Sequence, residues 1–150
     1  MIREKTTVKL EVSAQCPSHS RADISVRDQT FSIDEPVARG GTNEGPTPTD
    51  TALAALVGCT NVIGHKCAAK LGIDIGHLNI SVVADFDRRG VTLTEEIDVP
   101  FAAIRLEVKS DGPSTQAELQ QVADETAKYC PLSKMFRAAG TVVTEDWSAA

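Results

Sequence analysis

Aromatic side chains and clustered positive charge are both scarce in this sequence. Phenylalanine, tyrosine and tryptophan make up 4% of the residues, so aliphatic side chains and alanine must fill the core. The formal net charge is -6, and the lysines and arginines are scattered along the chain. Nucleic acids and anionic membrane surfaces bind concentrated positive charge. Neither is therefore expected as a partner.

Long apolar runs are missing as well. No stretch of about 18 apolar residues occurs, so we expect no membrane-spanning helix. The segment 1–13 alternates charged and apolar residues and lacks the apolar stretch of a signal peptide. We therefore expect a cytoplasmic protein, whose four cysteines are reduced at rest and do not form a structural disulfide framework.

Internal repeats, low-complexity tracts and long linkers are also absent from the 150 residues. A chain of this length is typical of one domain and can bury a core without crosslinks. We predict a single domain over residues 1–150, of mixed α+β class.

The N-terminal part of the chain alternates apolar and polar residues in three short segments. Residues 5–13, 24–26 and 30–34 each follow the period-two pattern of a half-buried strand. A tight turn at 28–29 joins the second segment to the third. The pattern predicts an antiparallel meander of three strands.

Turn-forming residues then dominate the segment 34–48, where glycine and proline recur. We expect an ordered loop there, because glycine supplies positive φ and proline fixes φ. A long helix follows over about 49–71. Thr49 or Asp50 is suited to cap its first turn, and Gly72 is suited to end it.

Further strands and two helices are expected beyond the long helix. The strands lie near 77–86, 101–109 and 141–147, with a hairpin or an extended strand excursion over 87–100. A second helix opens at the capping-box pair Thr115 and Glu118. Cys130 is placed as the N-cap of a short third helix, whose first residue is Pro131.

The central helix is apolar on two faces. At about 100° per residue, one stripe is expected to pack on the sheet; it consists of Leu53, Leu56, Val57, Thr60, Gly64, Cys67 and Leu71. A second apolar face consists of Ala52, Ala55, Cys59 and Val62. One domain of this size offers one sheet, so a second subunit is the simplest cover for the second face. The sequence thus predicts a homodimer, with Cys59 turned toward the partner.

The cysteines differ in their expected roles. Cys67 lies on the main stripe and is expected in the core. Cys16 and His19, together with His65 and Cys67, carry the residue types of a metal site. However, residues two apart on a helix point in opposite directions, so His65 and Cys67 cannot share one ion.

Two cysteines remain as candidates for redox chemistry. Cys59 follows Gly58 among small side chains that leave room for a ligand. Cys130 as an N-cap would face unpaired backbone N–H groups, which lower a thiol pKa. From spacing alone, both a reactive pair and two buried core residues stay open.

The chain resembles the OsmC/Ohr family, over essentially its whole length. The first matching motif is a Gly/Pro loop that leads into a helix bearing a cysteine: Asp34-Glu35-Pro36, Gly40-Gly41-Thr42, Gly45-Pro46-Thr47-Pro48-Thr49-Asp50 and Leu53-Ala54-Ala55-Leu56-Val57-Gly58-Cys59. The second is Lys128-Tyr129-Cys130-Pro131-Leu132-Ser133. The match is to the broader OsmC-like group of that family.

The resemblance implies both a fold and a chemistry. The fold is an intertwined α+β homodimer, with an N-terminal antiparallel meander, a long central helix, a second sheet portion and C-terminal helices. The chemistry is thiol-dependent reduction of organic hydroperoxides and, to a lesser degree, hydrogen peroxide. By resemblance Cys59 is the peroxidatic cysteine and Cys130 the resolving one. No metal or organic cofactor is implied, and the external reductant is a dithiol, possibly of the lipoyl type.

The family also places an arginine and a carboxylate near the first cysteine. Asp50 stands where the family usually has a glutamate, and Arg21 matches the arginine best by position, with Arg27 and Arg39 as alternatives. Asp50 opens the helix that carries Cys59, and about 13 Å of helix axis separates the two residues. Asp50 would therefore act on Cys59 only through a bridging guanidinium.

The sequence leaves two alternatives outside peroxide chemistry. A dimeric OsmC-like module that binds a small apolar or thiol ligand would leave the cysteines idle, and it would need no resolving thiol. A hydrolase with Cys59 as nucleophile and His65 as base is disfavoured, because six residues along a helix turn the two side chains about 240° apart.

Overall fold

The computed structural model describes residues 4–150, which form two compact units divided after Ala52. The predicted single domain includes residues 1–3, which lie outside the described residues. The long helix α1 (Pro48–Leu71) begins at the end of the first unit and continues as part of the second.

The first unit contains the predicted three-stranded antiparallel meander, in the order β1 (Ser13–Gln15), β2 (Ala22–Val26) and β3 (Gln29–Ile33). The turn between β2 and β3 lies one residue earlier than expected, because Val26 pairs with Gln29. Arg27 enters this turn with a φ of 55°. Such a positive φ is typical of two-residue hairpin turns.

The predicted strand over 5–13 is wrong except at its last residue. Only Ser13–Gln15 pairs with β2, and the alternating side chains of Val8, Leu10 and Val12 are 70%, 90% and 66% exposed. The period-two pattern specifies a strand only where a neighbouring strand and an apolar surface receive it. Among residues 4–150 of this one chain, residues 4–12 have neither.

A buried carboxylate organises the loop between β3 and α1. Asp34 accepts hydrogen bonds from the backbone N–H groups of Glu35, Thr42 and Glu44, and from the hydroxyl of Thr42. These donors hold the pKa of Asp34 well below its usual range. The loop also needs Gly41, because a Cβ there would lie 1.9 Å from the carbonyl oxygen of Glu35.

Helix α1 starts with a reciprocal capping arrangement, one residue before the predicted start at about 49. The N–H of Asp50 donates to Oγ1 of Thr47 at 3.1 Å, and the N–H of Thr47 donates to a carboxylate oxygen of Asp50 at 3.4 Å. Thr47 is therefore the cap, where Thr49 or Asp50 was expected, and Asp50 lies in the first turn. Gly72, with a φ of 70°, follows the helix end as predicted.

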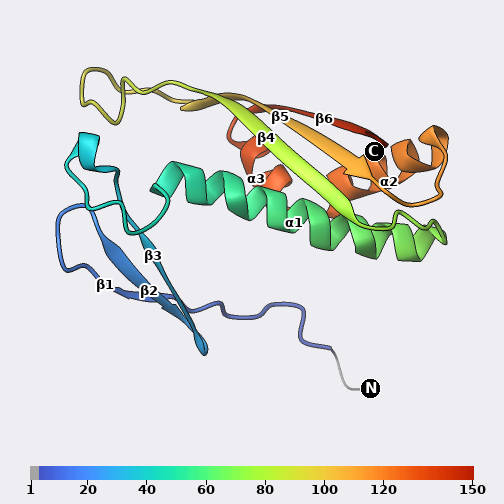
Figure 1. Ribbon diagram of the computed structural model, residues 1–150, viewed down its shortest axis with the longest axis horizontal. Coiled ribbons are helices and arrows are strands. Elements are labelled where there is room, and N and C mark those ends of the chain that lie inside the picture. The colour runs from blue at the N-terminus through green and yellow to red at the C-terminus, as the bar shows by residue number, and fades with distance from the viewer. Residues whose placement is uncertain (1–3) are drawn as a thin grey trace. The chain divides into compact units, whose positions relative to one another are not determined.

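The second unit is a three-stranded sheet covered by helices on one face (Figure 1). The strand order is β4 (Leu78–Phe86), β5 (Phe101–Ser110) and β6 (Val142–Ala149). Strand β5 pairs antiparallel with β4 and parallel with β6. The parallel pairing needs a crossover, which α2 (Gln116–Tyr129) and α3 (Pro131–Ala138) provide.

The predicted elements of this second unit are confirmed to within two residues at their ends. Thr115 and Glu118 form the expected capping box at the start of α2. The segment between β4 and β5 contains turns rather than an extension of the strands. There Arg89 holds the segment together, because its guanidinium contacts Asp87 and Glu95 at 2.7 Å each.

The core of the second unit lies where α1 and α2 meet the inner face of the sheet. Cys67 is 5% exposed within it, so its predicted core position is confirmed. The buried cluster consists of Cys67, Ala68, Ile75, Val108, Leu119, Val122, Ala123 and Trp147. A Cβ on Gly64 would lie 2.8 Å from Cη2 of Trp147, so only glycine lets the indole approach α1 this closely.

The two-sided character of α1 is visible in its exposure. Leu56, Thr60, Gly64 and Cys67 of the predicted stripe are buried, whereas Leu71 at its end is 40% exposed. On the second face, Val62 is 52% exposed and Ala55 is exposed. Within residues 4–150 of one chain, this part of the face is uncovered, whereas Ala52 and Cys59 of the same face are half-buried.

Helix α1 is also long and apolar enough to span a membrane by length and composition, with a mean hydropathy of 1.2 in its best window. This differs from the expectation that no segment would qualify. The test does not separate a membrane span from a core helix, which has the same length and composition. Several residues of α1 are buried against the sheet, which is compatible with a core helix.

Replacing Gly64 by alanine is expected to destabilise the protein, because the new methyl group overlaps the Trp147 ring. We expect the free energy of unfolding to fall by about 1–3 kcal/mol, measured by urea denaturation and followed by near-UV circular dichroism of this single tryptophan. The control is Lys66→Ala, at an exposed position of the same helix. Equal stability of the two variants would contradict close packing at Gly64.

Candidate functional site: the Cys59–Cys130 pair

The structure brings Cys59 and Cys130 together, although 71 positions separate them in the sequence. Their Sγ atoms lie 3.2 Å apart, and both are free thiols. Cys59 comes from the middle of α1, and Cys130 comes from the junction between α2 and α3. A modest shift brings the sulfurs to the bond length of a disulfide, about 2.05 Å.

Cys130 is held as the N-cap of α3, as predicted. Its Sγ accepts a hydrogen bond from the N–H of Ser133 at 3.4 Å, and Pro131 occupies the first turn. The same residue ends α2, because its N–H donates to the carbonyl oxygen of Thr126 at 2.9 Å. Two helix ends thus fix the backbone of Cys130.

The expected lowering of the Cys130 pKa is not observed. The pKa of this thiol is raised to about 11: burial is the largest cause and the neighbouring Cys59 adds to it, whereas the Ser133 N–H bond acts in the opposite direction. The side chain is 1% exposed, so loss of hydration outweighs the attraction of the helix N-terminus. Cys130 therefore keeps its proton at neutral pH and donates an S–H···S hydrogen bond to Cys59.

Cys59 lies in more open surroundings than Cys130. Its side chain is half-buried, and the preceding Gly58 is exposed, with no atom within 4 Å of the place where a Cβ would lie. In one chain, a small molecule can thus reach Cys59 while Cys130 stays covered. The pair combines a half-buried thiol with a buried one.

Arg21 and Asp50 belong to the first unit, and the structure does not pair them. The guanidinium of Arg21 contacts Asp23 at 2.8 Å, and the carboxylate of Asp50 accepts a hydrogen bond from the N–H of Thr47 in the first turn of α1. Among the alternatives, Arg39 pairs with Glu35 at 2.8 Å and Arg27 forms the β2–β3 turn. The predicted roles of Arg21 and Asp50 toward Cys59 stay predictions.

The residues weighed for metal binding or hydrolysis are not arranged for either. No group of potential metal ligands occurs among residues 4–150. The two ring nitrogens of His65 lie 2.9 Å from the carbonyl oxygen of Asn61 and 3.0 Å from that of Gly76. Both nitrogens are therefore engaged by backbone, and His65 is not arranged to act as a base.

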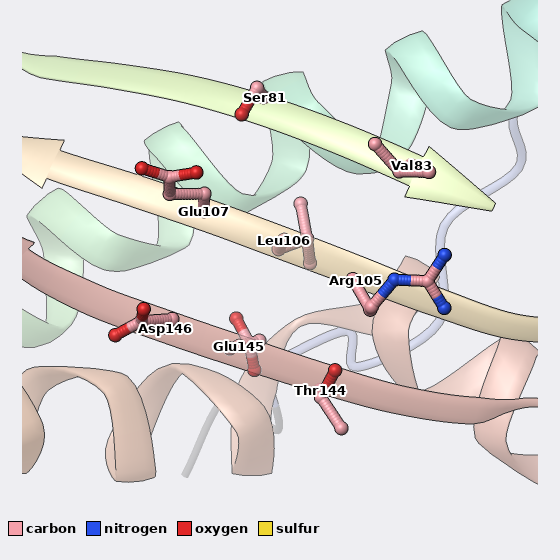
Figure 2. Close-up of a pocket in the computed structure, with 8 residues that line it drawn as sticks. All are labelled: Ser81, Val83, Arg105, Leu106, Glu107, Thr144, Glu145 and Asp146. Carbon is pink, nitrogen blue, oxygen red and sulfur yellow. The ribbon is translucent and has the colours of Figure 1, made fainter.

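A shallow groove of about 390 Å³ lies on the second sheet and carries no thiol or imidazole (Figure 2). Three of its charged side chains pair with neighbours: Arg105 with Asp85 at 3.0 Å, Glu107 with Lys109 at 3.3 Å and Glu145 with Arg137 at 3.6 Å. The lining residues are Ser81, Val83, Arg105, Leu106, Glu107, Thr144, Glu145 and Asp146. The cysteine pair is the stronger candidate, because it joins two nucleophilic groups.

The model of a protein family described as OsmC-like protein matches residues 41–146, which include both cysteines and the helices that hold them. The chain belongs to this OsmC-like family. No curated protein matches the chain. Family membership now rests on the matched residues as well as on the two sequence motifs.

Solved structures of OsmC/Ohr proteins share the fold. An OsmC-like protein from Mycoplasma pneumoniae superimposes with a TM-score of 0.80 at 18% identity, covering 95% of this chain and 98% of that one. An organic hydroperoxide resistance protein OsmC from Legionella pneumophila gives 0.72 at 16% identity, covering 96% and 99%. The organic hydroperoxide resistance protein OhrB of Bacillus subtilis gives 0.65 at 20% identity, covering 94% and 98%.

Sequence reasoning missed the polar residues behind Cys130 in this OsmC-like chain. Ser133 supplies the N–H that bonds to Cys130, and its hydroxyl accepts a hydrogen bond from Arg137 at 3.1 Å. Ser133 and Arg137 are four residues apart on one predicted helix, and this spacing could have predicted their contact. Arg137 on α3 also lies 3.6 Å from Glu145 on β6, and no local sequence pattern predicts this contact between a helix and a strand.

The raised pKa of Cys130 makes stability depend on alkaline pH. Between about 9 and about 11 the folded protein keeps this proton, whereas the unfolded chain releases it. Proton release favours the unfolded state, so the free energy of unfolding should fall as the pH rises through this window. Urea midpoints of wild type and Cys130→Ala measure the difference in slope. Exposed Cys16 gives the control Cys16→Ala, and equal slopes in all three proteins would contradict the assignment.

Proposed function

We propose that this OsmC-like protein is a thiol-dependent peroxidase that reduces organic hydroperoxides through Cys59 and Cys130. The observation that carries the proposal is the 3.2 Å contact between a half-buried and a buried thiol. The names of the Legionella and Bacillus structures, which describe organic hydroperoxide resistance proteins, favour the same chemistry. A module that only binds a ligand has no need of this contact.

The first step is attack by the thiolate of Cys59 on the O–O bond of a hydroperoxide. The sulfur gives an electron pair to the terminal oxygen of the hydroperoxide, and the O–O bond breaks. The oxygen bound to carbon leaves as an alkoxide and takes a proton to become an alcohol. Cys59 becomes a sulfenic acid. A cation near the leaving oxygen would stabilise the developing charge, and Arg21 is our candidate for that role, with Asp50 orienting it.

The second step joins the two sulfurs. Cys130 attacks the sulfenic sulfur of Cys59, the S–O bond breaks, and hydroxide leaves with the proton of Cys130 as water. Cys59 is then no longer a negative neighbour of Cys130, so one cause that raises the Cys130 pKa disappears when it must react. The protonated resting state thus protects Cys130 from oxidation without blocking resolution.

A dithiol completes the cycle by exchange with the Cys59–Cys130 disulfide, and both cysteines return to thiols. We propose a lipoyl-type dithiol as the reductant, acting in a reducing cytoplasm. The small and apolar side chains around Cys59 on α1, Ala55 and Val62, favour a hydroperoxide with an apolar tail. No metal or organic cofactor enters any step.

We also propose that the working form is a homodimer. Part of the second face of α1 is uncovered in one chain, and the alternating side chains of Val8, Leu10 and Val12 are exposed. Both are apolar surfaces that a second copy would bury. The solved OsmC/Ohr structures show the same fold and are compatible with that arrangement.

Titration of free thiols with one equivalent of tert-butyl hydroperoxide tests the peroxidase. Wild type should lose the thiols of Cys59 and Cys130 together, whereas Cys59→Ser should lose none. Cys130→Ser should stop after one turnover with a sulfenic acid at Cys59, detected by dimedone trapping and mass spectrometry. The control is Cys67→Ser, which removes a core thiol outside the pair.

If the thiols of the wild type did not react with the hydroperoxide, the peroxidase proposal would be contradicted. The ligand-binding module would then be the remaining function. Continuous turnover of Cys130→Ser with a dithiol would instead remove Cys130 as the resolving cysteine.

Light scattering should give twice the 16.0 kDa mass of one chain at micromolar concentration. Ala55→Glu should weaken this dimer, because it places an unpaired charge in the buried face. Ala117→Glu, at an exposed position of α2, is the matched control. A 16.0 kDa particle at every concentration would contradict the dimer.

A further inference from the structure

A line of polar contacts runs from Cys130 to the edge strand of the second sheet. The N–H of Ser133 donates to Sγ of Cys130 at 3.4 Å, and Nε of Arg137 donates to Oγ of Ser133 at 3.1 Å. The other end of the Arg137 guanidinium lies 3.6 Å from a carboxylate oxygen of Glu145 on β6. One arginine thus links the turn that holds the buried cysteine to a neighbouring strand.

Glu145 is an unusual residue for its place in β6. Its neighbours on the same face, Val143 and Trp147, are core residues, and its own side chain is only 7% exposed. A carboxylate in this position loses hydration, and this burial raises the pKa of Glu145, whereas the Trp147 side chain and the nearby cation Arg137 act in the opposite direction. An apolar side chain would fill the position without that requirement.

We propose that Arg137 and Glu145 form a latch that positions Cys130 for attack on oxidised Cys59. Both are positioning residues: they touch Ser133 and one another rather than the reacting sulfurs. The biological role of the latch rests on the proposed function. Its effect on disulfide formation does not, because Cys130 attacks Cys59 in the same way whichever oxidant has reacted with Cys59.

The latch acts on a short and demanding movement. The sulfurs must close from 3.2 Å to about 2.05 Å, with Cys130 aligned on the bond that breaks at Cys59. Cys130 is the N-cap of α3, so the orientation of the first turn of α3 sets the approach of its sulfur. A misplacement of about 1 Å in such a step can slow it a hundredfold.

The latch predicts that its variants slow only the second of two measurable steps. Arg137→Gln and Glu145→Gln should form the sulfenic acid at the wild-type rate, in a stopped-flow reaction with tert-butyl hydroperoxide followed by dimedone trapping. The same variants should form the Cys59–Cys130 disulfide about ten- to a hundredfold more slowly. The control, Lys134→Gln, changes an exposed residue of α3 and should leave both rates unchanged.

Arg137→Lys separates positioning from charge. Lysine keeps the positive charge opposite Glu145 but cannot contact Ser133 and Glu145 from two ends of a planar group. The latch predicts slow disulfide formation in this variant too. Full rescue by lysine would show that the cation only compensates a buried carboxylate, and would overturn the proposal.

A second route to the same disulfide keeps this test independent of the peroxidase. The thiolate of Cys59 attacks oxidised glutathione, the glutathione S–S bond breaks, and one glutathione leaves as a thiolate while the other stays bound to Cys59 as a mixed disulfide. Cys130 then attacks the sulfur of Cys59, the mixed disulfide breaks, and the second glutathione leaves as the Cys59–Cys130 bond forms. The rate of this second release should fall in Arg137→Gln and Glu145→Gln by the same factor as above. The latch would be overturned if these variants released the second glutathione at the wild-type rate. It would also be overturned if they slowed formation of the mixed disulfide and release of glutathione equally. A wild type inert to hydroperoxide with slowed release in the variants would overturn only the peroxidase.

Discussion

Close contact between the indole of Trp147 and α1 at Gly64 determines how the helix lies on the second sheet. This contact fixes the rotation of α1, and that rotation decides which residues face the core and which face away. Cys67 points into the cluster, and Cys59, nearer the N-terminus of the helix, meets Cys130 at the α2–α3 junction. A different rotation would bury other residues and separate the two sulfurs, because interiors tolerate little change in shape. The site thus depends on packing some distance from it.

Local signals in the sequence were enough to predict most of the elements. The capping box at Thr115, the cap at Cys130 and the stop at Gly72 each have a short-range physical cause, and each is present. The pairing of Cys59 with Cys130 followed from the family resemblance, since spacing alone left it open. Residues 5–13 show the opposite case, because an alternating pattern indicates a strand but cannot supply the strand that pairs with it.

The properties that sequence could not predict are those that depend on burial. The cap position of Cys130 suggested a reactive thiol, yet loss of hydration dominates and keeps the proton in place. Glu145 read as an ordinary member of a strand, yet it faces inward between Val143 and Trp147. In both cases the residue and its local geometry were predictable, whereas the depth of burial came from elements far away in the sequence.

The contact between Cys59 and Cys130 depends on a strand that comes after both cysteines in the chain, because β6 pairs in parallel with β5. Strand β6 can join the sheet only after the crossover through α2 and α3 has formed, and such long-range pairing is a slow part of folding. Before β6 docks, Trp147 does not yet fix α1, and Glu145 does not yet hold Arg137. During synthesis, both thiols emerge from the ribosome before the strand that fixes their separation. The new chain therefore passes through a period in which both cysteines are present but are not yet held next to one another.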